Sequence, residues 1–141
     1  MIDSMNSAFK KIVHSDPNLI PKVDEFIFDK ISSLNLESEV LSNLGLAISE
    51  ALSNAMVHGN KLDPDKDVTV SVKIYDDKLT ISIKDEGKGF DPNKVPDPTK
   101  PENILRDSGR GIHIMRSFID EVLFDFSSVG TELIFIIKLK K

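Results

Sequence analysis

The sequence predicts a single α/β domain whose elements follow the order β-α-α-β-β-α-β-β. Apolar residues recur at helical spacing in two stretches, residues 18–35 and 40–58. Between residues 68 and 83 the apolar period becomes two, which is typical of paired strands. The length of 141 residues favours one domain, which would cover residues 1–141.

Composition and charge restrict the possible functions. Hydrophobic residues make up 40% of the chain and charged residues 29%, an ordinary composition for a globular protein. The formal net charge of −5 argues against direct nucleic-acid binding, which requires a clustered basic face. The chain has no cysteine, which excludes disulfides and cysteine-ligated metals and agrees with a cytoplasmic location. We expect no membrane contact, because no stretch approaches the roughly 20 apolar residues of a membrane span and residues 1–11 lack the pattern of a secretory signal.

The first part of the chain is expected to form a strand and two helices. A weak strand pattern covers residues 8–13. Pro21 would remove a helical hydrogen bond beyond the first turn, so the first helix should begin near residue 18 or later and fade near residue 35. The second helix should run to about His58, where Gly59 and Asn60 would provide a left-handed stop.

The second part of the chain is expected to form two hairpins separated by a loop and a short helix. The first hairpin pairs residues 68–74 with residues 79–83. Residues 91–108 have no apolar period and contain four of the seven prolines, so we expect them to form a lid over a ligand. A helix over residues 111–119 then leads to strands over residues 121–126 and 131–139. The last strand is apolar on both faces, which predicts a central place in the sheet under covering helices.

Three polar residues, Glu50, Asn54 and His58, stand at steps of four in the second helix. On an α-helix this spacing places them along one face, beside an apolar stripe that would pack into the core. Glu50 can take a proton from a water or from an acceptor hydroxyl. The neutral oxygen of Asn54 suits a Mg²⁺ ion that triphosphate oxygens already hold. Taken alone, the three residues are equally compatible with a solvated helix face, and His58 with a structural residue at the helix end.

Glycines follow the second strand of the first hairpin, in the segment Asp85-Glu86-Gly87-Lys88-Gly89-Phe90. Gly87 and Gly89 have no side chains, so the backbone could pass close to a flat ligand. Asp85, at the strand end, can accept a hydrogen bond from an exocyclic amine such as that of adenine. A plain turn is the alternative interpretation of this segment.

A second glycine turn, Ser108-Gly109-Arg110-Gly111-Ile112, opens the predicted third helix. Free N–H groups and the positive end of a helix dipole suit phosphates there, and Arg110 could reach a γ-phosphate. Other sites for phosphate chemistry and hydrolysis are excluded, because the chain has no GxxxxGK[ST], HRD, DFG, HExxH or GxSxG motif.

Taken together, the motifs ExxxNAxxHG, DxGxGF and SGRGIxIM resemble, in order and spacing, those of the Bergerat-fold ATPases, the superfamily of gyrase, mismatch-repair ATPases and histidine kinases. Within this superfamily the chain is most similar to the single-domain anti-sigma-factor serine kinases of bacteria. The resemblance covers nearly the whole chain. It implies a two-layer α/β sandwich in which a mixed, mainly antiparallel sheet carries three helices on one face.

The resemblance also implies roles for individual residues. Glu50 would be the base that receives the hydroxyl proton of a serine. Asn54 would hold Mg²⁺ between the phosphates of ATP, and Asp85 would bind the adenine amino group. The other residues expected at the nucleotide are His58, Gly87, Gly89, Phe90, Gly109, Arg110, Gly111, Ile112 and Thr131.

Three functions remain open at this point. The resemblance favours an ATP-dependent serine kinase, usually a homodimer, that phosphorylates an anti-sigma antagonist and sequesters a sigma factor. The second is a nucleotide-gated regulatory binding module without catalysis. The third is the ATPase part of a histidine kinase, for which a lid longer than residues 91–108 is expected.

Overall fold

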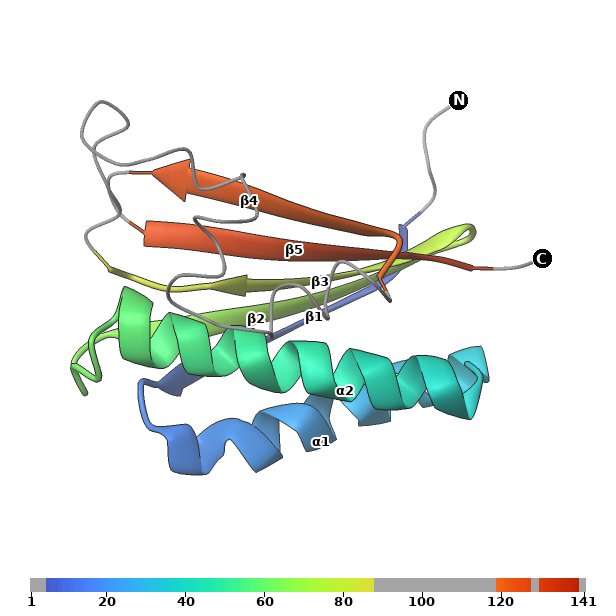
Figure 1. Ribbon diagram of the computed structural model, residues 1–141. Coiled ribbons are helices and arrows are strands. Elements are labelled where there is room, and N and C mark those ends of the chain that lie inside the picture. The colour runs from blue at the N-terminus through green and yellow to red at the C-terminus, as the bar shows by residue number, and fades with distance from the viewer. Residues whose placement is uncertain (1–4, 88–118, 128–129, 140–141) are drawn as a thin grey trace.

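The computed structural model of the protein describes residues 5–87, 119–127 and 130–139. These residues form a five-stranded sheet with two α-helices on one face (Figure 1). The strands are β1 (Met5–His14), β2 (Asp67–Tyr75), β3 (Lys78–Lys84), β4 (Glu121–Ser127) and β5 (Gly130–Lys138). The helices are α1 (Ile20–Ile31) and α2 (Ser38–Ser53), with 3₁₀ turns η1 (Pro17–Leu19) and η2 (Ser32–Leu34) at the ends of α1 and a π-helical turn η3 (Asn54–Gly59) after α2.

The predicted order of elements is confirmed for the part of the chain that the structure describes. The predicted lid over residues 91–108 lies outside it, as does the third helix over residues 111–119 except for its last residue. The strand order is β1-β2-β3-β5-β4, so β5 occupies the interior position predicted from its apolar residues. The expectation of a mainly antiparallel sheet is confirmed, and the four pairings are all antiparallel rather than mixed. Of the three helices expected on one face, the described residues contain two.

One face of the sheet supplies most of the core. Side chains alternate between the two faces along a strand, and the buried ones of β2 are Val68, Val70, Val72 and Ile74. The register carries this row across the sheet, because Val72 lies opposite Ile81 and Ile81 lies opposite Phe135. Phe135 is fully buried at the centre. The period of two in the sequence therefore corresponds to one buried face.

The two helices cover this face (Figure 1). The buried residues of α1 are Val23, Ile27 and Ile31, which recur at four-residue steps and so share one side of the helix. Asp16 caps the entry to η1 by accepting a hydrogen bond from the Asn18 amide at 3.0 Å. The left-handed Asn35, at φ 52°, ends η2 close to the expected position. The buried residues of α2 are Leu44, Ala47, Ile48, Ala51 and Leu52.

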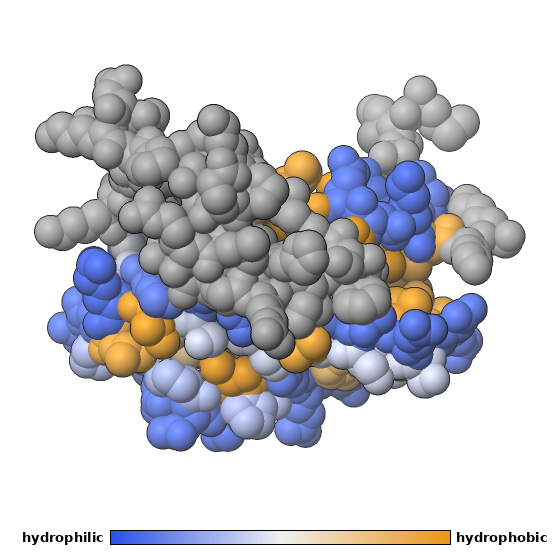
Figure 2. Space-filling model, in the orientation of Figure 1, coloured by the Kyte–Doolittle hydropathy of each residue, from blue (hydrophilic) through white to orange (hydrophobic). Residues whose placement is uncertain are grey.

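The segment Ser38–Gly59 reaches the length and mean hydropathy, 1.2, of a candidate membrane span. The expectation that no stretch approaches the length and apolar composition of a membrane span is therefore wrong. In the fold, however, the apolar side of this segment packs against the sheet. Figure 2 shows hydrophilic areas along the helical side of the molecule with smaller apolar patches between them. Such a two-sided helix is typical of a protein core, and the composition is weak support for a membrane span.

Candidate functional site

The helix that carries Glu50, Asn54 and His58 changes from α-helical to π-helical geometry at Asn54. Glu50 lies in the last turn of α2, and Asn54 is the first residue of the π-helical turn η3. Here the Asn60 amide donates to the Ala55 carbonyl at 2.8 Å, five residues back rather than four. π-Helical turns of this kind are rare in proteins, and those that do occur are often found at functional sites.

His58 differs from the other two residues in its exposure to solvent. Glu50 and Asn54 are both half-buried, whereas His58 is exposed. The prediction of one regular α-helix up to His58 is wrong in this respect, because the wider turn changes the angular step per residue. Glu50 and Asn54 stand four residues apart where α2 ends, and the exposed His58 follows four residues later within the wider turn.

Asp85 is a nearly buried carboxylate directly after β3, with an exposed fraction of 6%. Its Oδ1 accepts hydrogen bonds from the backbone amides of Gly87 at 2.9 Å and Thr131 at 3.1 Å. Its own amide donates to the Thr131 carbonyl at 3.0 Å. Asp85 is therefore held against the start of β5 by backbone groups on both strands.

The surroundings of Asp85 disfavour its charge. Burial raises the pKa of the Asp85 carboxyl above its ordinary value, while the hydrogen bonds from Gly87 and Thr131 and the positive charge of Lys66 oppose this rise. A carboxylate that is shielded from water in this way gains more from a hydrogen-bond donor on a ligand than an exposed one would. Perturbed carboxyl groups of this kind are candidates for functional sites.

Three glycines surround Asp85, and each stands where a Cβ atom would collide. A Cβ atom at Gly59 would lie 2.2 Å from Asp85 Oδ2, and one at Gly130 would lie 2.2 Å from the Asp85 carbonyl oxygen. A Cβ atom at Gly87 would lie 2.2 Å from the Gly59 carbonyl oxygen. The end of η3, the turn after β3 and the start of β5 thus meet with their backbones in contact, which only glycine permits.

The contact at Gly59 corrects the expectation of a left-handed helix stop. Asn60 is right-handed, at φ −87°. The left-handed residues are the next two, Lys61 at φ 54° and Leu62 at φ 60°. Gly59 is needed for its closeness to Asp85, and the chain reverses one residue beyond Asn60. Gly130, at φ 142°, is a third member of the site that the motifs did not indicate.

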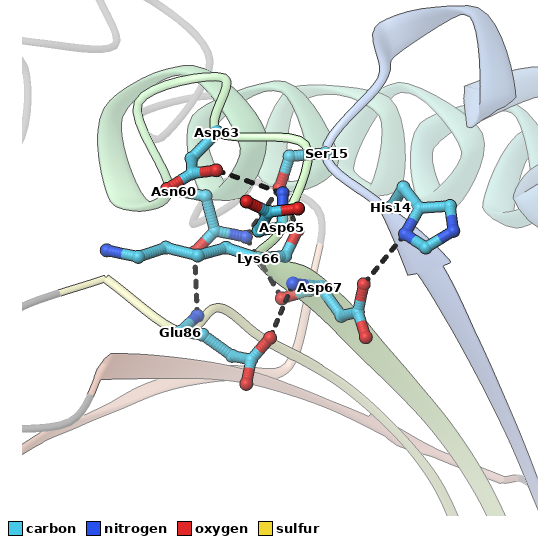
Figure 3. A network of polar contacts seen from close by, with 8 residues as sticks. All are labelled: His14, Ser15, Asn60, Asp63, Asp65, Lys66, Asp67 and Glu86. Atoms are coloured by element: carbon cyan, nitrogen blue, oxygen red, sulfur yellow. Dashed lines mark hydrogen bonds and ion pairs between the residues drawn. The ribbon is translucent and has the colours of Figure 1, made fainter.

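A network of polar contacts lies beside Asp85 and joins three strands to the end of η3 (Figure 3). Asn60 is its central side chain, with an exposed fraction of 1%. It bonds to Ser15, to the Asp67 carbonyl and to the Glu86 amide. Sequence reasoning assigned Asn60 to the helix stop and missed this network, because its partners are distant in the chain.

The remaining expected site residues are placed only in part. Gly89, Phe90, Gly109, Arg110, Gly111 and Ile112 lie outside the described residues. Thr131 contacts Asp85 through its backbone, so the predicted role of its hydroxyl stays a prediction. The described ranges contain no group of three or more His, Asp or Glu side chains that could hold a metal ion. The neutral oxygen of half-buried Asn54 fits a Mg²⁺ ion whose other ligands are phosphate oxygens and water.

Comparison with known proteins relates the chain to a family and to curated relatives. Residues 13–137 match the family model of the histidine kinase-like ATPase domain. The anti-sigma F factor of Bacillus cytotoxicus is 33% identical over 138 residues, which cover 94% of this chain and 90% of the relative. The anti-sigma F factor of Geobacillus stearothermophilus is 36% identical over 99 residues, which cover 67% of this chain and 66% of the relative.

The fold of the chain is also similar to that of a solved structure. The RsbU and RsbW domains of a Mycobacterium tuberculosis protein superimpose with a TM-score of 0.68 over 96% of this chain and 33% of theirs, at 14% identity. This similarity concerns the fold alone. The family match spans nearly all of the chain, including the end of α2, the Asp85 turn and the start of β5. The chain belongs to the histidine kinase-like ATPase domain family.

Proposed function

We propose that the protein binds Mg-ATP between the end of α2 and the turn at Asp85, with Asp85 as the residue that recognises adenine. The nearly buried Asp85 carboxylate carries this proposal. Among the described residues, the backbone amides of Gly87 and Thr131 both bond to Oδ1, which orients the carboxylate, and we assign Oδ2 as the acceptor for the adenine amine. Asn54 would complete the coordination of Mg²⁺, which supplies charge neutralisation at the phosphate oxygens when it is bound.

We further propose that the reaction is phosphoryl transfer to a serine hydroxyl. The serine oxygen attacks the γ-phosphorus, the bond from that phosphorus to the β,γ-bridging oxygen breaks, and ADP leaves. The hydroxyl proton passes to Glu50, which lies four residues before Asn54 at the end of α2. Gly109, Gly111 and Arg110 would hold the phosphates under a lid formed by residues 91–108.

The named relatives support a proposal for the regulatory role. Those relatives are anti-sigma F factors, and identities of 33% and 36% support a similar role for this chain. We propose that the protein sequesters a sigma factor and phosphorylates a serine of its anti-sigma antagonist, acting as a homodimer in the cytoplasm. The net charge of −5 supports protein partners rather than direct nucleic-acid contact.

Phosphoryl transfer can be tested with the full chain, magnesium, γ-labelled ATP and the antagonist protein. We expect label on a serine of the antagonist, and Glu50→Ala should lower its rate by roughly 10²–10⁴-fold because the proton acceptor is lost. ATP affinity of this variant should stay near that of the wild type. Glu39→Ala, an exposed residue in the first turn of the same helix, removes the same charge and serves as the matched control.

Three outcomes would contradict parts of this proposal. Transfer by Glu50→Ala at the wild-type rate would refute the role of that residue. ATP binding by the wild type without any transfer would favour a nucleotide-gated binding module, and transfer to a histidine would favour a histidine kinase system.

A further inference from the structure

Asn60 is the most completely bonded polar side chain that the structure describes next to the nucleotide site. Its Nδ2 donates to Ser15 Oγ at 2.6 Å and to the Asp67 carbonyl at 2.9 Å. Its Oδ1 accepts from the Glu86 amide at 2.7 Å. Only 1% of the residue is exposed. The side chain thus uses both donor hydrogens and its acceptor inside the protein, where an unpaired polar group would be costly.

The three bonds reach three different strands. Ser15 directly follows β1, Asp67 begins β2, and Glu86 lies just beyond β3 (Figure 3). The backbone of Asn60 is fixed as well, because its amide donates to the Ala55 carbonyl at 2.8 Å and its carbonyl accepts from the Asp63 amide at 3.0 Å. Asn60 therefore links the end of the π-helical turn to the ends of three strands.

Only one of the three bonds acts on Asp85. The Glu86 amide belongs to the peptide group that follows Asp85, so its bond to Asn60 fixes the orientation of that group. The Asp85 amide, on the preceding peptide, is held by the Thr131 carbonyl. The residue next to Asn60, Gly59, lies against Asp85 Oδ2. Asn60 is thus linked to Asp85 by its bond to the Glu86 amide and by its chain neighbour Gly59.

We propose that Asn60 is a positioning residue for base recognition, which directs the Asp85 carboxylate toward the exocyclic amine of adenine. This inference rests on the proposed binding of adenine at Asp85. It predicts that the preference for nucleotides with the exocyclic amine over nucleotides without it depends on Asn60. This dependence is separate from any contribution of Asn60 to the stability of the fold. A bond to Ser15 alone would stabilise the fold without affecting the direction of Asp85.

The test compares the affinity of the full chain for ATP with that for purine riboside triphosphate, which lacks the amine. Titration calorimetry in the presence of magnesium gives both values. Wild type should prefer ATP by about tenfold or more, since a hydrogen bond to a charged group contributes at least that much. Asn60→Ala should reduce the preference to less than about threefold because the direction of Asp85 is no longer fixed.

Ser15→Ala is the matched control. It removes the shortest bond of the Asn60 side chain, and the Lys66 carbonyl keeps its bond from the Ser15 amide at 3.2 Å. Both Asn60→Ala and Ser15→Ala should lower the urea midpoint of unfolding, but Ser15→Ala should keep the wild-type preference for ATP. The ratio of two affinities is measured on folded molecules, so a partly unfolded sample does not change it.

Asn60→Asp covers the case in which Asn60→Ala does not fold. The new carboxylate keeps an acceptor for the Glu86 amide but loses the donors to Ser15 and Asp67. It should weaken both nucleotides by its charge and keep most of the preference for ATP. A preference that persists in Asn60→Ala, or that disappears in Asn60→Asp, would overturn the positioning role. A wild type without preference would instead overturn the proposed adenine contact itself.

Discussion

Asp85→Asn should weaken the binding of ATP without lowering the stability of the protein. Asparagine has nearly the same shape, and its amide oxygen can accept the bonds from Gly87 and Thr131 that Oδ1 accepts at 2.9 and 3.1 Å. Its NH₂ group would then stand in the place of Oδ2 and face the adenine amine with a second donor. The loss of a hydrogen bond to a charged acceptor amounts to about 1.5–3 kcal/mol, or a weakening of ATP affinity by about 10- to 150-fold.

The same substitution should not destabilise the protein. Burial raises the pKa of the Asp85 carboxyl, so its favourable contribution to folding is present below the ordinary pKa of about 3.9 and is lost as the pH rises through the folded value. At pH 7 the wild type therefore folds with an unfavourable buried charge. The neutral asparagine avoids this cost, and we expect the free energy of unfolding of Asp85→Asn to equal or exceed that of the wild type.

The assay is calorimetric titration with Mg-ATP together with urea unfolding at pH 7. Asp77→Asn, in the exposed turn between β2 and β3, makes the same change of charge away from the site and should alter neither quantity appreciably. Unchanged ATP affinity in Asp85→Asn would refute the adenine assignment. A clear fall in stability would show that the charge of Asp85 is favourable in the fold and would contradict an unfavourable buried charge.

Three further variants test a glycine contact at the site, the packing of the core and a charge between the two helices. Gly130→Ala places a Cβ 2.2 Å from the Asp85 carbonyl at φ 142°, and we expect a loss of about 1–3 kcal/mol in urea unfolding; an unchanged midpoint would contradict the close contact. Phe135→Ala empties the centre of the core and should cost about 3–5 kcal/mol, with a loss below 1 kcal/mol arguing against its central position. Burial raises the pKa of Asp24, and the hydrogen bond from Ser49 opposes the rise, so Ser49→Ala should raise that pKa further. The resulting loss of stability should be present at pH 7 and shrink as the pH falls and Asp24 takes up its proton; equal losses at pH 7 and pH 4 would speak against the interaction.

The fold could be predicted largely from local patterns. The hairpin of β2 and β3 follows from alternation with a period of two, since one residue of slip would expose the whole apolar row. The first helix follows from apolar residues at four-residue steps and from Pro21 near its start. The π-helical turn after Ser53 escaped prediction, because no local pattern distinguishes it from another turn of α-helix.

The candidate site could be predicted only where its signal is local. Asp85 stands out as a carboxylate at the end of an alternating strand, followed by glycines. Gly59 in the sequence predicts a helix stop, whereas in the fold it allows the close approach of Asp85; both situations favour glycine, so the sequence does not distinguish them. Gly130 lies between the strands predicted over residues 121–126 and 131–139, and nothing near it in the chain indicates that it contacts Asp85.

Periodicity, motif order and composition determined the class of fold, the succession of elements and the family, because each of these is written in residues close together in the chain. The tertiary structure alone decided which groups hold the Asp85 carboxylate. Its bond to Thr131 spans 46 positions, and the bond from Glu86 to Asn60 spans 26. Contacts over such distances form only when the sheet is assembled, and their geometry depends on how strands and helices pack rather than on any local preference.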